Sequence, residues 1–359
     1  MARVEIDADI RKAVTPPSEL YTDAGIFDDL REKVFARSWQ WLDVPRLEAG
    51  SAVPCALLPE LVNAPLVVSR DGDGSDHCFS NVCTHRGHLV CKEMVSGTRG
   101  LRCGYHGRRF RLDGSFEHMP AFEEVDNFPT KDDDLTARPL HRWGPLAFTS
   151  LEDTAPFDEW IDFTRDRVAF LPFDDFQPDP EGTRSYEVEA NWILYCENFL
   201  EGFHIPFVHA SLNEVLEFGE YKVELFPSGT LQVGIAKEGE PVFELPGNHV
   251  NAGQRVGAFY AWLFPNLMLN FYPWGLSLNA VLPLAPTKTR VEYRRYLWRP
   301  DLLDQGAGGD LHRVEMEDEA VVESVQKGVG SRLYRRGRYS PKHERGTHHL
   351  HRLLSSALG

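Results

Sequence analysis

The chain has 359 residues, a formal net charge of −16, and 42% hydrophobic residues, including 11% aromatics. This length and composition suit one large or two ordinary domains with a sizeable core. The acidic balance excludes nucleic acid as the main partner, because that class of protein presents a basic face. The sequence holds no run of about 20 apolar residues, so no membrane span is expected. The charged start lacks a signal-peptide core, and the six cysteines are too few for a disulfide scaffold. A reducing, cytoplasmic setting is therefore expected.

The first half of the chain is expected to begin with a helix over residues 17–42, where apolar residues recur at helical spacing. From residue 51 to 150 the sequence changes to short apolar runs broken by Gly, Pro and Asp, and two pairs of runs flank Asp-Gly turns. Strands are expected at residues 64–69, 77–82, 109–112, 115–118 and 139–151. This part of the chain is therefore predicted to be a small all-β module.

The second half is expected to combine helices with an antiparallel sheet. A helix is predicted over 156–171, and a Pro/Asp-rich loop over 174–182 is a candidate boundary. A strand over 185–190 precedes a buried helix over 191–203. Further strands are expected at residues 221–226, 231–236, 256–264, 267–272, 276–282 and 290–298. An amphipathic helix over 309–327 and a short C-terminal helix complete the chain.

Two short Cys/His pairs, Cys83-x-His85 and Cys103-x-x-His106, form the most specific pattern in the sequence. Two Cys and two His suit a tetrahedral zinc ion. They also suit a [2Fe–2S] cluster that carries both thiolates on one iron and both imidazoles on the other. A glycine follows shortly after each histidine, and the second pair runs straight into a predicted hairpin. The ligands are therefore expected at the tips of the β module, which favours the cluster over zinc.

The segment 198–209 holds Glu201, His204 and His209, a set of side chains that suits a divalent transition metal. On a regular helix the two histidines point about 140° apart, and Pro206 lies between them. A local break in the helix would allow both imidazoles to reach one metal. The alternative is a helix end that carries two unrelated histidines.

A third ligand for such a metal must come from later in the chain, and the predicted helix 309–327 offers Asp318. At about 100° per residue, the apolar residues of this helix share one face: Leu311, Val314, Val321, Val322 and Val325. Asp318 falls near the centre of that face, where a carboxylate is costly unless it is paired or metal-bound. Three other carboxylates fall on its flanks or outside it: Glu315, Glu317 and Glu319. The alternative role for Asp318 is a salt bridge to a buried arginine.

These motifs resemble those of one enzyme family. The runs CTHRGH and CGYHG resemble the cluster-binding loops of Rieske-type oxygenases and ferredoxins. Glu201-x-x-His204-x4-His209 resembles the catalytic motif of Rieske non-haem iron oxygenases. Nearly the whole chain takes part in the resemblance. Dioxygenases with a separate small subunit carry ENFxGDxYHxxxxH, whereas this motif is one residue shorter and has Glu in place of Asp. That difference, and the run 264–286, resemble the choline and carnitine monooxygenases and related demethylases.

The resemblance implies an α+β protein, in which an all-β Rieske module is inserted before a catalytic domain of antiparallel sheet and helices (helix-grip, START-like). The implied parts are an N-terminal helical segment, 1–42, that contacts the catalytic domain, a Rieske domain, 43–152, and the catalytic domain, 153–359. The implied [2Fe–2S] ligands are Cys83, His85, Cys103 and His106. The implied ligands of the mononuclear Fe(II) are His204, His209 and Asp318. Glu201 is then no ligand, but links a cluster histidine of the neighbouring subunit to an iron-bound histidine.

The implied reaction is reductive activation of O₂ and insertion of an oxygen atom into a small organic molecule. Hydroxylation next to nitrogen would lead to demethylation. The chain has no dinucleotide-binding fingerprint, so NAD(P)H would be used indirectly, through a separate flavin/iron–sulfur reductase or a ferredoxin. The family also implies a homotrimer, or a multiple of trimers, in which electrons pass between subunits.

The substrate stays open at this point. Aromatic residues crowd the predicted catalytic half and would serve a quaternary ammonium compound, such as choline, betaine or carnitine, or an aromatic ring. The alternatives to a monooxygenase or demethylase are therefore an aromatic-ring-hydroxylating dioxygenase, a Rieske electron carrier without enzyme activity, and a zinc-bearing scaffold. Arg86, Arg108 and Arg109 flank the cluster loops. They are expected to be ordinary surface charges, and the alternative is a basic patch that docks an acidic electron donor.

Overall fold

The computed structural model describes residues 4–152 and 154–359. The chain divides into two compact units. Residues 36–154 form one unit, called here the inserted unit. Residues 1–35 and 155–359 form the other, called here the main unit. Residue 153, where the predicted catalytic domain begins, lies outside the described residues. Within those residues, no helix is both long enough and apolar enough to span a membrane.

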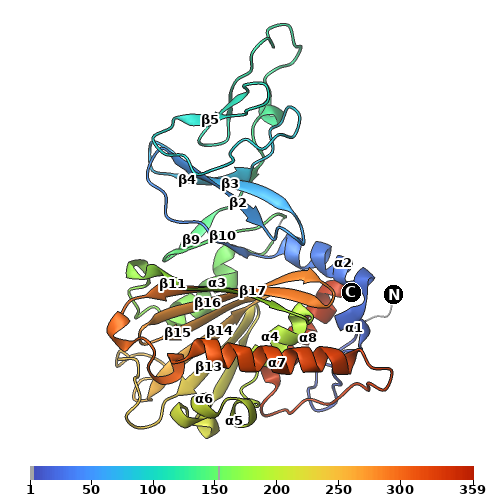
Figure 1. Cartoon of the computed structure of the whole chain (residues 1–359), viewed down its shortest axis with the longest axis vertical. Coiled ribbons are helices and arrows are strands. Elements are labelled where there is room, and N and C mark those ends of the chain that lie inside the picture. The colour runs from blue at the N-terminus through green and yellow to red at the C-terminus, as the bar shows by residue number, and fades with distance from the viewer. Residues whose placement is uncertain (1–3, 153) are drawn as a thin grey trace. The chain divides into compact units, whose positions relative to one another are not determined.

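The inserted unit is built from three small antiparallel sheets (Figure 1). Their strand orders are β2-β3-β4-β8, β5-β6-β7 and β1-β10-β9. The strands are β1 (Gln40–Leu42), β2 (Ser51–Leu57), β3 (Ala64–Arg70), β4 (Asp76–Ser80), β5 (Gly100–Arg102), β6 (Arg109–Arg111), β7 (Phe116–His118), β8 (Ala137–Arg138), β9 (His141–Trp143) and β10 (Leu146–Thr149). Both predicted Asp-Gly hairpins are confirmed, as β3–β4 and β6–β7. The predicted all-β module is confirmed with them.

Two expectations for this half of the chain are wrong in part. The helix predicted over 17–42 ends early: α1 (Glu19–Thr22) and α2 (Ala24–Lys33) lie in the main unit, and the last three residues form β1. Their backbone pairs with β10, which overrides the helical pattern. The single strand predicted over 139–151 is a hairpin of β9 and β10, because Gly144 adopts φ +55° at the turn between them.

The main unit is organised on a seven-stranded antiparallel sheet with the order β11-β17-β16-β15-β14-β13-β12. The strands are β11 (Gln177–Val188), β12 (Lys222–Phe226), β13 (Gly229–Ile235), β14 (Val256–Leu263), β15 (Leu267–Tyr272), β16 (Gly275–Ala285) and β17 (Lys288–Leu297). The predicted sheet is therefore confirmed. The loop predicted over 174–182 is wrong, because the backbone from Gln177 pairs with β17, with an irregularity between Asp179 and Arg184 that accommodates the turn residues.

Helices of the main unit cover the sheet. The longer ones are α3 (Phe157–Arg167), α4 (Trp192–Phe199), α7 (Leu311–Val329) and α8 (Arg345–Leu358). The short ones are α5 (Ile205–Val208) and α6 (Ala210–Val215). The 3-10 turns of the chain are η1 (Phe35–Arg37), η2 (Lys131–Asp133), η3 (Phe173–Asp175), η4 (Phe218–Glu220), η5 (Pro300–Leu302) and η6 (Gly306–Gly308). Helix α4 contacts α7, α8 and β16, so α4 and α7 lie side by side against the sheet (Figure 1).

Candidate functional site

The two Cys/His loops of the inserted unit have the same backbone design. In the first, the Cys83 amide donates to the His88 carbonyl, and the Gly87 amide donates to the Cys83 carbonyl. In the second, the Cys103 amide donates to the Arg108 carbonyl, and the Gly107 amide donates to the Cys103 carbonyl. Gly87 and Gly107 have φ of +71° and +76°, a region that favours glycine. The sequence therefore builds two equivalent loops.

These loops hold their cysteines inward and their histidines outward. Cys83 and Cys103 are 3% and 2% exposed, whereas His106 is exposed. Burial, together with the neighbouring Cys103 thiol, raises the pKa of Cys83. On the outer side, Nδ1 of His85 lies 3.1 Å from Nδ1 of His106. Two nitrogens at about 2 Å from one metal, nearly at right angles, would have this separation.

The arrangement of these four side chains fits a two-metal cluster better than one zinc ion. Ligand atoms around a single tetrahedral zinc lie within about 4 Å of one another. Among the described residues, only His204, His209 and Asp318 bring three or more such atoms within 4.8 Å. The two sulfurs and two nitrogens of the loops therefore do not converge on one point. The two thiols interact with each other, and so do the two imidazoles, a pairing that suits a [2Fe–2S] cluster with thiolates on one iron and imidazoles on the other.

Arg108 is buried, so the expectation that it is an ordinary surface charge is wrong. Its side chain is 2% exposed, and Nη2 lies 2.7 Å from Oδ1 of Asp133. Its guanidinium lies 5.7, 4.9 and 5.5 Å from the ring centroids of Phe110, Phe116 and Phe128. Arg108 thus holds the second loop against its hairpin. Arg86 and Arg109 are exposed, as expected.

In the main unit, the segment after α4 folds as three short pieces rather than one broken helix. Helix α4 ends at Phe199, and the backbone then loops through Gly202 to α5 and α6. Pro206 lies in the first turn of α5, where its missing N–H costs nothing, so it helps to start a helix rather than to break one. His204 precedes α5 and His209 separates α5 from α6. The breaks therefore lie at the histidines, and they turn both rings to one side.

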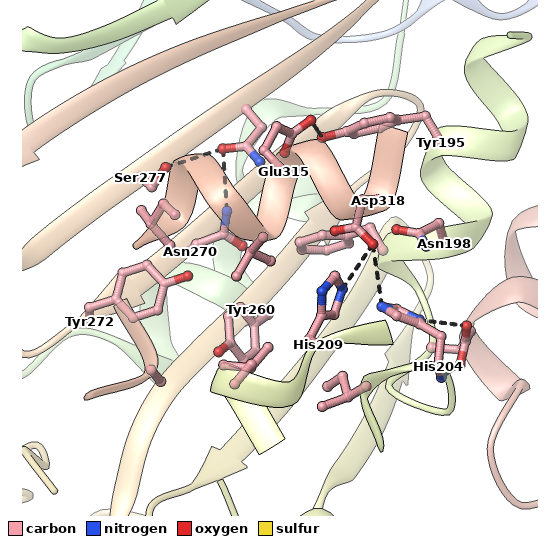
Figure 2. A pocket seen from close by; sticks show the side chains of 18 of the residues that line it. Tyr195, Asn198, His204, His209, Tyr260, Asn270, Tyr272, Ser277, Glu315 and Asp318 are labelled. Carbon is pink, nitrogen blue, oxygen red and sulfur yellow. Dashed lines mark hydrogen bonds and ion pairs between the residues drawn. The ribbon is translucent and has the colours of Figure 1, made fainter. Parts of the chain in front are cut away.

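Both imidazoles meet Asp318 of α7 (Figure 2). Nε2 of His209 lies 2.9 Å from Oδ1 of Asp318, and Nε2 of His204 lies 3.5 Å from the same oxygen. His209 is 1% exposed, while His204 and Asp318 are each 16% exposed. Two histidines and one carboxylate on one side of a metal, with open positions opposite, form the facial triad of oxygen-activating non-haem iron. The donor set and its spacing therefore fit the expected iron.

A second carboxylate holds each histidine from behind. Oε1 of Glu201 lies 2.7 Å from Nδ1 of His204, and Oε2 of Glu317 lies 2.8 Å from Nδ1 of His209. Glu201 also accepts the backbone N–H groups of Phe203 and His204. Burial alone would lower the pKa of His209, but Asp318 and Glu317 raise it. Carboxylates in this position fix the tautomer and orientation of ligating histidines. Glu317, which the helical projection puts on the flanks of the apolar face or outside it, thus supports His209, a role that the sequence did not indicate.

The burial of α7 also differs from the helical projection. Glu315 and Glu319 are only 6% and 9% exposed, although both were expected on the flanks or outside the apolar face. Val325, expected on that face, is 41% exposed. The buried positions recur as Glu315, Glu319, Val322, Gln326 and Val329. At Glu315 the reason is that this part of α7 faces a cavity and the hydroxyl groups of Tyr195 and Tyr293.

That cavity opens from the triad and has a volume of about 100 Å³. It lies between α4, α5, α7 and the inner face of the sheet (Figure 2). At about 10–15 Å³ for each water-sized group, it holds roughly seven to ten of them. Its aromatic walls include Phe199, Tyr221, Tyr260, Tyr272 and Tyr293. Its size therefore suits a small molecule, and its walls suit an apolar or cationic one.

The two Cys/His loops and the triad together fit the two metal centres of an iron-dependent oxygenase. Comparison with known proteins agrees. The model of the "Rieske [2Fe-2S] domain" matches residues 53–129, and that of the "Ring hydroxylating alpha subunit (catalytic domain)" matches residues 179–359. The chain belongs to the Rieske-type ring-hydroxylating oxygenase alpha subunits, and it is an oxygenase of that family, whose members carry a [2Fe–2S] cluster and non-haem iron.

Relatives match over nearly the full chain. A chloroplastic choline monooxygenase of Arabidopsis thaliana is 31% identical, with 97% of this chain and 84% of that protein covered. The carnitine monooxygenase oxygenase subunit of Escherichia coli (strain K12) is 28% identical, with 98% and 96% covered. Among solved structures, the quaternary ammonium Rieske monooxygenase CntA has a TM-score of 0.79 at 21% identity, with 99% of each chain covered. Naphthalene 1,2-dioxygenase from Rhodococcus sp. has a TM-score of 0.74 at 21% identity, with 96% and 93% covered.

These findings confirm some of the expectations from the sequence and exclude others. The α+β fold with a Rieske domain and a sheet-and-helix catalytic domain is confirmed, as is the terminal oxygenase. The zinc scaffold and the Rieske electron carrier are both excluded as readings of the whole chain, because the catalytic-domain match spans residues 179–359.

Proposed function

We propose that this chain oxidises a carbon next to the nitrogen of a small quaternary ammonium compound, by hydroxylation or by the demethylation that follows it. The observation that carries this proposal is the triad of His204, His209 and Asp318 at the wall of a small, tyrosine-lined cavity. Tyrosine faces attract alkylammonium groups, because the ring quadrupole is negative above the plane. The relatives named choline and carnitine monooxygenase support the same substrate class.

An aromatic-ring dioxygenase is the second candidate, and the shared fold with naphthalene 1,2-dioxygenase is its support. The cavity weighs against it. Its walls carry several polar side chains, among them Asn270, Ser277 and Asn279. A ring of apolar carbon atoms would leave Oδ1 of Asn270, which has no partner among the described residues, without a hydrogen bond.

The metal-binding roles proposed for the chain follow from the two sites. Cys83 and Cys103 hold one iron of the [2Fe–2S] cluster, and His85 and His106 hold the other. His204, His209 and Asp318 hold the mononuclear iron, which when bound supplies the centre at which O₂ is reduced. Glu317 holds the His209 ring in place through Nδ1. The tyrosine walls exclude bulk water and keep the substrate carbon beside the triad.

Electron transfer between subunits is proposed through Glu201. Its Oε1 bonds Nδ1 of His204, so a group that bonds its outer side is coupled to a ligating imidazole. Exposed aromatic side chains lie near it in sequence, with Phe203 41% and Phe207 81% exposed. Tyr105, beside His106 on the cluster loops, is 56% exposed. Apolar surface of this kind marks contact sites. The proposed assembly is a homotrimer, or a multiple of trimers, in which the cluster loops of one subunit meet Glu201 of the next.

The remaining proposals concern partners, location and domains. A separate flavin/iron–sulfur reductase or ferredoxin supplies the electrons from NAD(P)H, and the exposed Arg86 and Arg109 offer it positive charge. The enzyme works in the cytoplasm. Its parts are the N-terminal segment 1–42, the Rieske domain 43–152 and the catalytic domain 153–359.

The test combines metal analysis with product analysis. The purified protein should hold about three irons per chain, two in the cluster and one at the triad. With a reductase and O₂, it should convert choline, glycine betaine or carnitine either to an aldehyde and trimethylamine or to formaldehyde and the demethylated amine. His209→Ala should lower iron to about two per chain and abolish product. Efficient oxidation of naphthalene or benzoate, with no product from any of the ammonium compounds, would contradict the proposal.

A further inference from the structure

The substrate cavity holds a second carboxyl group that the metal triad does not use. Glu315 lies three residues before Asp318 on α7, so the two side chains share a face about 4.5 Å apart along the helix axis. Figure 2 shows both on the same helix above the cavity. Glu315 is 6% exposed. A group bound by Glu315 therefore lies within one helical turn of the proposed iron.

Two tyrosines fix this carboxyl group. The Tyr195 hydroxyl donates to Oε1 of Glu315 at 2.6 Å, and the Tyr293 hydroxyl donates to Oε2. Each oxygen keeps one further lone pair. Among the described residues, Glu315 forms no ion pair. A buried carboxylate without a cation is costly, and burial accordingly raises the pKa of Glu315 well above its usual range, although the bond from Tyr195 opposes this. The chain thus buries a carboxyl group, held by two hydroxyl donors, and among the described residues supplies no positive charge to balance its ionised form.

The walls around the site suit an alkylated cation. The rings of Tyr221 and Tyr260 have centroids 6.3 Å apart. The rings of Tyr260 and Tyr272 have centroids 5.9 Å apart and are inclined at 80°, so they form a corner. A corner of aromatic rings offers apolar surface to N-methyl groups and negative ring faces to the charge they carry.

The described walls of the cavity offer no permanently cationic side chain to pair with a carboxylate on the substrate. Among the described residues that line it, none is Lys or Arg, and the acidic ones are Glu201, Glu315 and Asp318. Iron at the triad would offset the charge of Asp318, but a substrate carboxylate would still be buried near Glu201 and Glu315, with no Lys or Arg side chain to pair with it. Electrostatic repulsion of this kind rejects a competitor more strongly than a small difference in size does.

Polar side chains on the sheet side of the cavity offer a hydrogen bond to the end of the substrate that lies away from Glu315. Asn270 is 5% exposed, and its Nδ2 donates to Oδ1 of Asn279 at 3.3 Å. Ser277 donates to the same oxygen at 3.2 Å. Oδ1 of Asn270 has no hydrogen-bond partner among the described residues. Figure 2 shows Asn270 and Ser277 across the cavity from His204. The free acceptor suits a hydroxyl group that donates a hydrogen bond.

We propose that Glu315 is the counter-ion of the substrate, and that it restricts the cavity to small alkylammonium cations without a carboxylate, a hydroxyl on the cation bonding Asn270. This inference rests on the proposed oxidation of a quaternary ammonium compound. It separates two kinds of quaternary ammonium compound. Choline-like cations are bound, whereas glycine betaine and carnitine, which carry a carboxylate, are rejected. Glu315 is then a specificity-determining residue that the sequence pattern did not indicate.

The test is equilibrium binding to the metal-loaded protein, measured by calorimetry without reductase. Three probes are compared: choline, glycine betaine, and 3,3-dimethyl-1-butanol, in which an uncharged carbon replaces the nitrogen of choline. We expect choline to bind at least about tenfold more tightly than the other two. Glu315→Gln should raise the Kd for choline about tenfold or more and leave that for the uncharged alcohol nearly unchanged. Glu323→Gln is the matched control, because it removes a carboxylate from α7 outside the cavity. It should change neither Kd.

The outcomes separate this inference from the proposed function. Equal binding of choline and the uncharged alcohol, tighter binding of glycine betaine, or an unchanged choline Kd in Glu315→Gln would each overturn the role of Glu315. Product formed from carnitine at high kcat/KM would overturn it too, while leaving the proposed function intact. Conversely, Glu315-dependent choline binding with no oxygen-dependent product from any ammonium compound would support the site and refute the proposed function.

Discussion

Glu317 Oε2 lies 2.8 Å from Nδ1 of His209, on the opposite side of the ring from Asp318. Arg313 in turn lies 3.2 Å from the other oxygen of Glu317. The pKa of Glu317 is lowered, chiefly by its bond to His209. A carboxylate so placed fixes the imidazole tautomer that leaves Nε2 free for a metal. We therefore predict that Glu317→Gln lowers iron affinity about 10–100-fold, measured by competition with a chelator.

The control for that prediction is again Glu323→Gln, which should keep full iron affinity. Cluster content should be unchanged in both variants, because the cluster ligands lie in the other unit. Iron affinity in Glu317→Gln within about twofold of the parent would mean that Glu317 pairs with Arg313 alone and does not support the metal.

Arg108 provides the second prediction, for the stability of the inserted unit. It is the buried member of an ion pair with Asp133. Removing one member of a buried pair costs about 3–5 kcal/mol. The lower end applies here, because Asp133 keeps a bond of 2.8 Å from the Thr130 amide. We expect Arg108→Met to lower the temperature at which the cluster absorbance is lost by at least about 10 °C.

Arg109→Met is the matched control, since this arginine is the next residue and is exposed. Its change in melting temperature should stay within about 2 °C. If Arg108→Met melts like the parent and instead slows reduction of the cluster by the donor, Arg108 would belong to a docking patch after all.

The sequence predicted the parts of this molecule that depend on local pattern. The β3–β4 and β6–β7 hairpins of the inserted unit, six of the strands of the main sheet and helix α3 follow from alternation, turn residues and helical spacing. The errors lie where tertiary pairing overrides that pattern. Gln40–Leu42 is a strand because β10 pairs with it, and β11 begins in a Pro/Asp-rich stretch because β17 pairs with it. Neither partner is visible from nearby sequence.

The candidate site shows the same difference between residues that local pattern predicts and residues whose role depends on tertiary contacts. Spacing made His204 and His209 candidate ligands, and the cost of an unpaired buried carboxylate singled out Asp318. The family resemblance was needed to combine the three, which meet in space. Glu317 and Glu315 were missed for a physical reason. Helical projection places residues relative to an apolar face, but it cannot show that the facing wall is made of tyrosines and a histidine. A carboxylate is stable against such a wall, as Glu315 is beside Tyr195 and Tyr293.

A third prediction concerns the pH dependence of cation binding. In the free cavity the raised pKa of Glu315 keeps it protonated above its ordinary range, and a bound cation favours the ionised form. Binding then releases a proton, so affinity for choline should rise with pH, by up to about tenfold per pH unit, until the pH passes the pKa of the free cavity. The titratable groups that face Glu315 are Tyr186, Tyr195, Tyr293, Asp318 and Glu319.

Calorimetry in buffers of different ionisation enthalpy measures that proton release. Glu315→Gln should remove most of the pH dependence. Glu319, whose pKa burial raises to about 7, does not line the cavity, so Glu319→Gln should retain it. A pH profile that is the same in the parent and in Glu315→Gln would assign the released proton to another group.

Glu201 gives the last prediction, because two roles compete for it. Its Oε1 bonds Nδ1 of His204, and its other oxygen bonds the amides of Phe203 and His204 at the start of α5. A purely structural role would make it a support of the iron ligand. An electron-transfer role would make it a link to the cluster of the neighbouring subunit. Glu201→Gln separates the two, because the amide keeps an oxygen for the backbone N–H groups while it removes the charge.

With Fe(II) supplied in excess, to offset a loss of affinity like that expected for Glu317→Gln, we expect Glu201→Gln to retain about three irons per chain and a reducible cluster. Product formation should fall at least about 100-fold, because one electron can no longer pass from the reduced cluster to the iron site. Rapid mixing of the reduced variant with O₂ and substrate, followed at the cluster absorbance, should show a cluster that stays reduced. The opposite result would be loss of iron from the triad, together with rapid oxidation of the cluster in those subunits that still hold their triad iron. That result would assign Glu201 to the support of His204 alone.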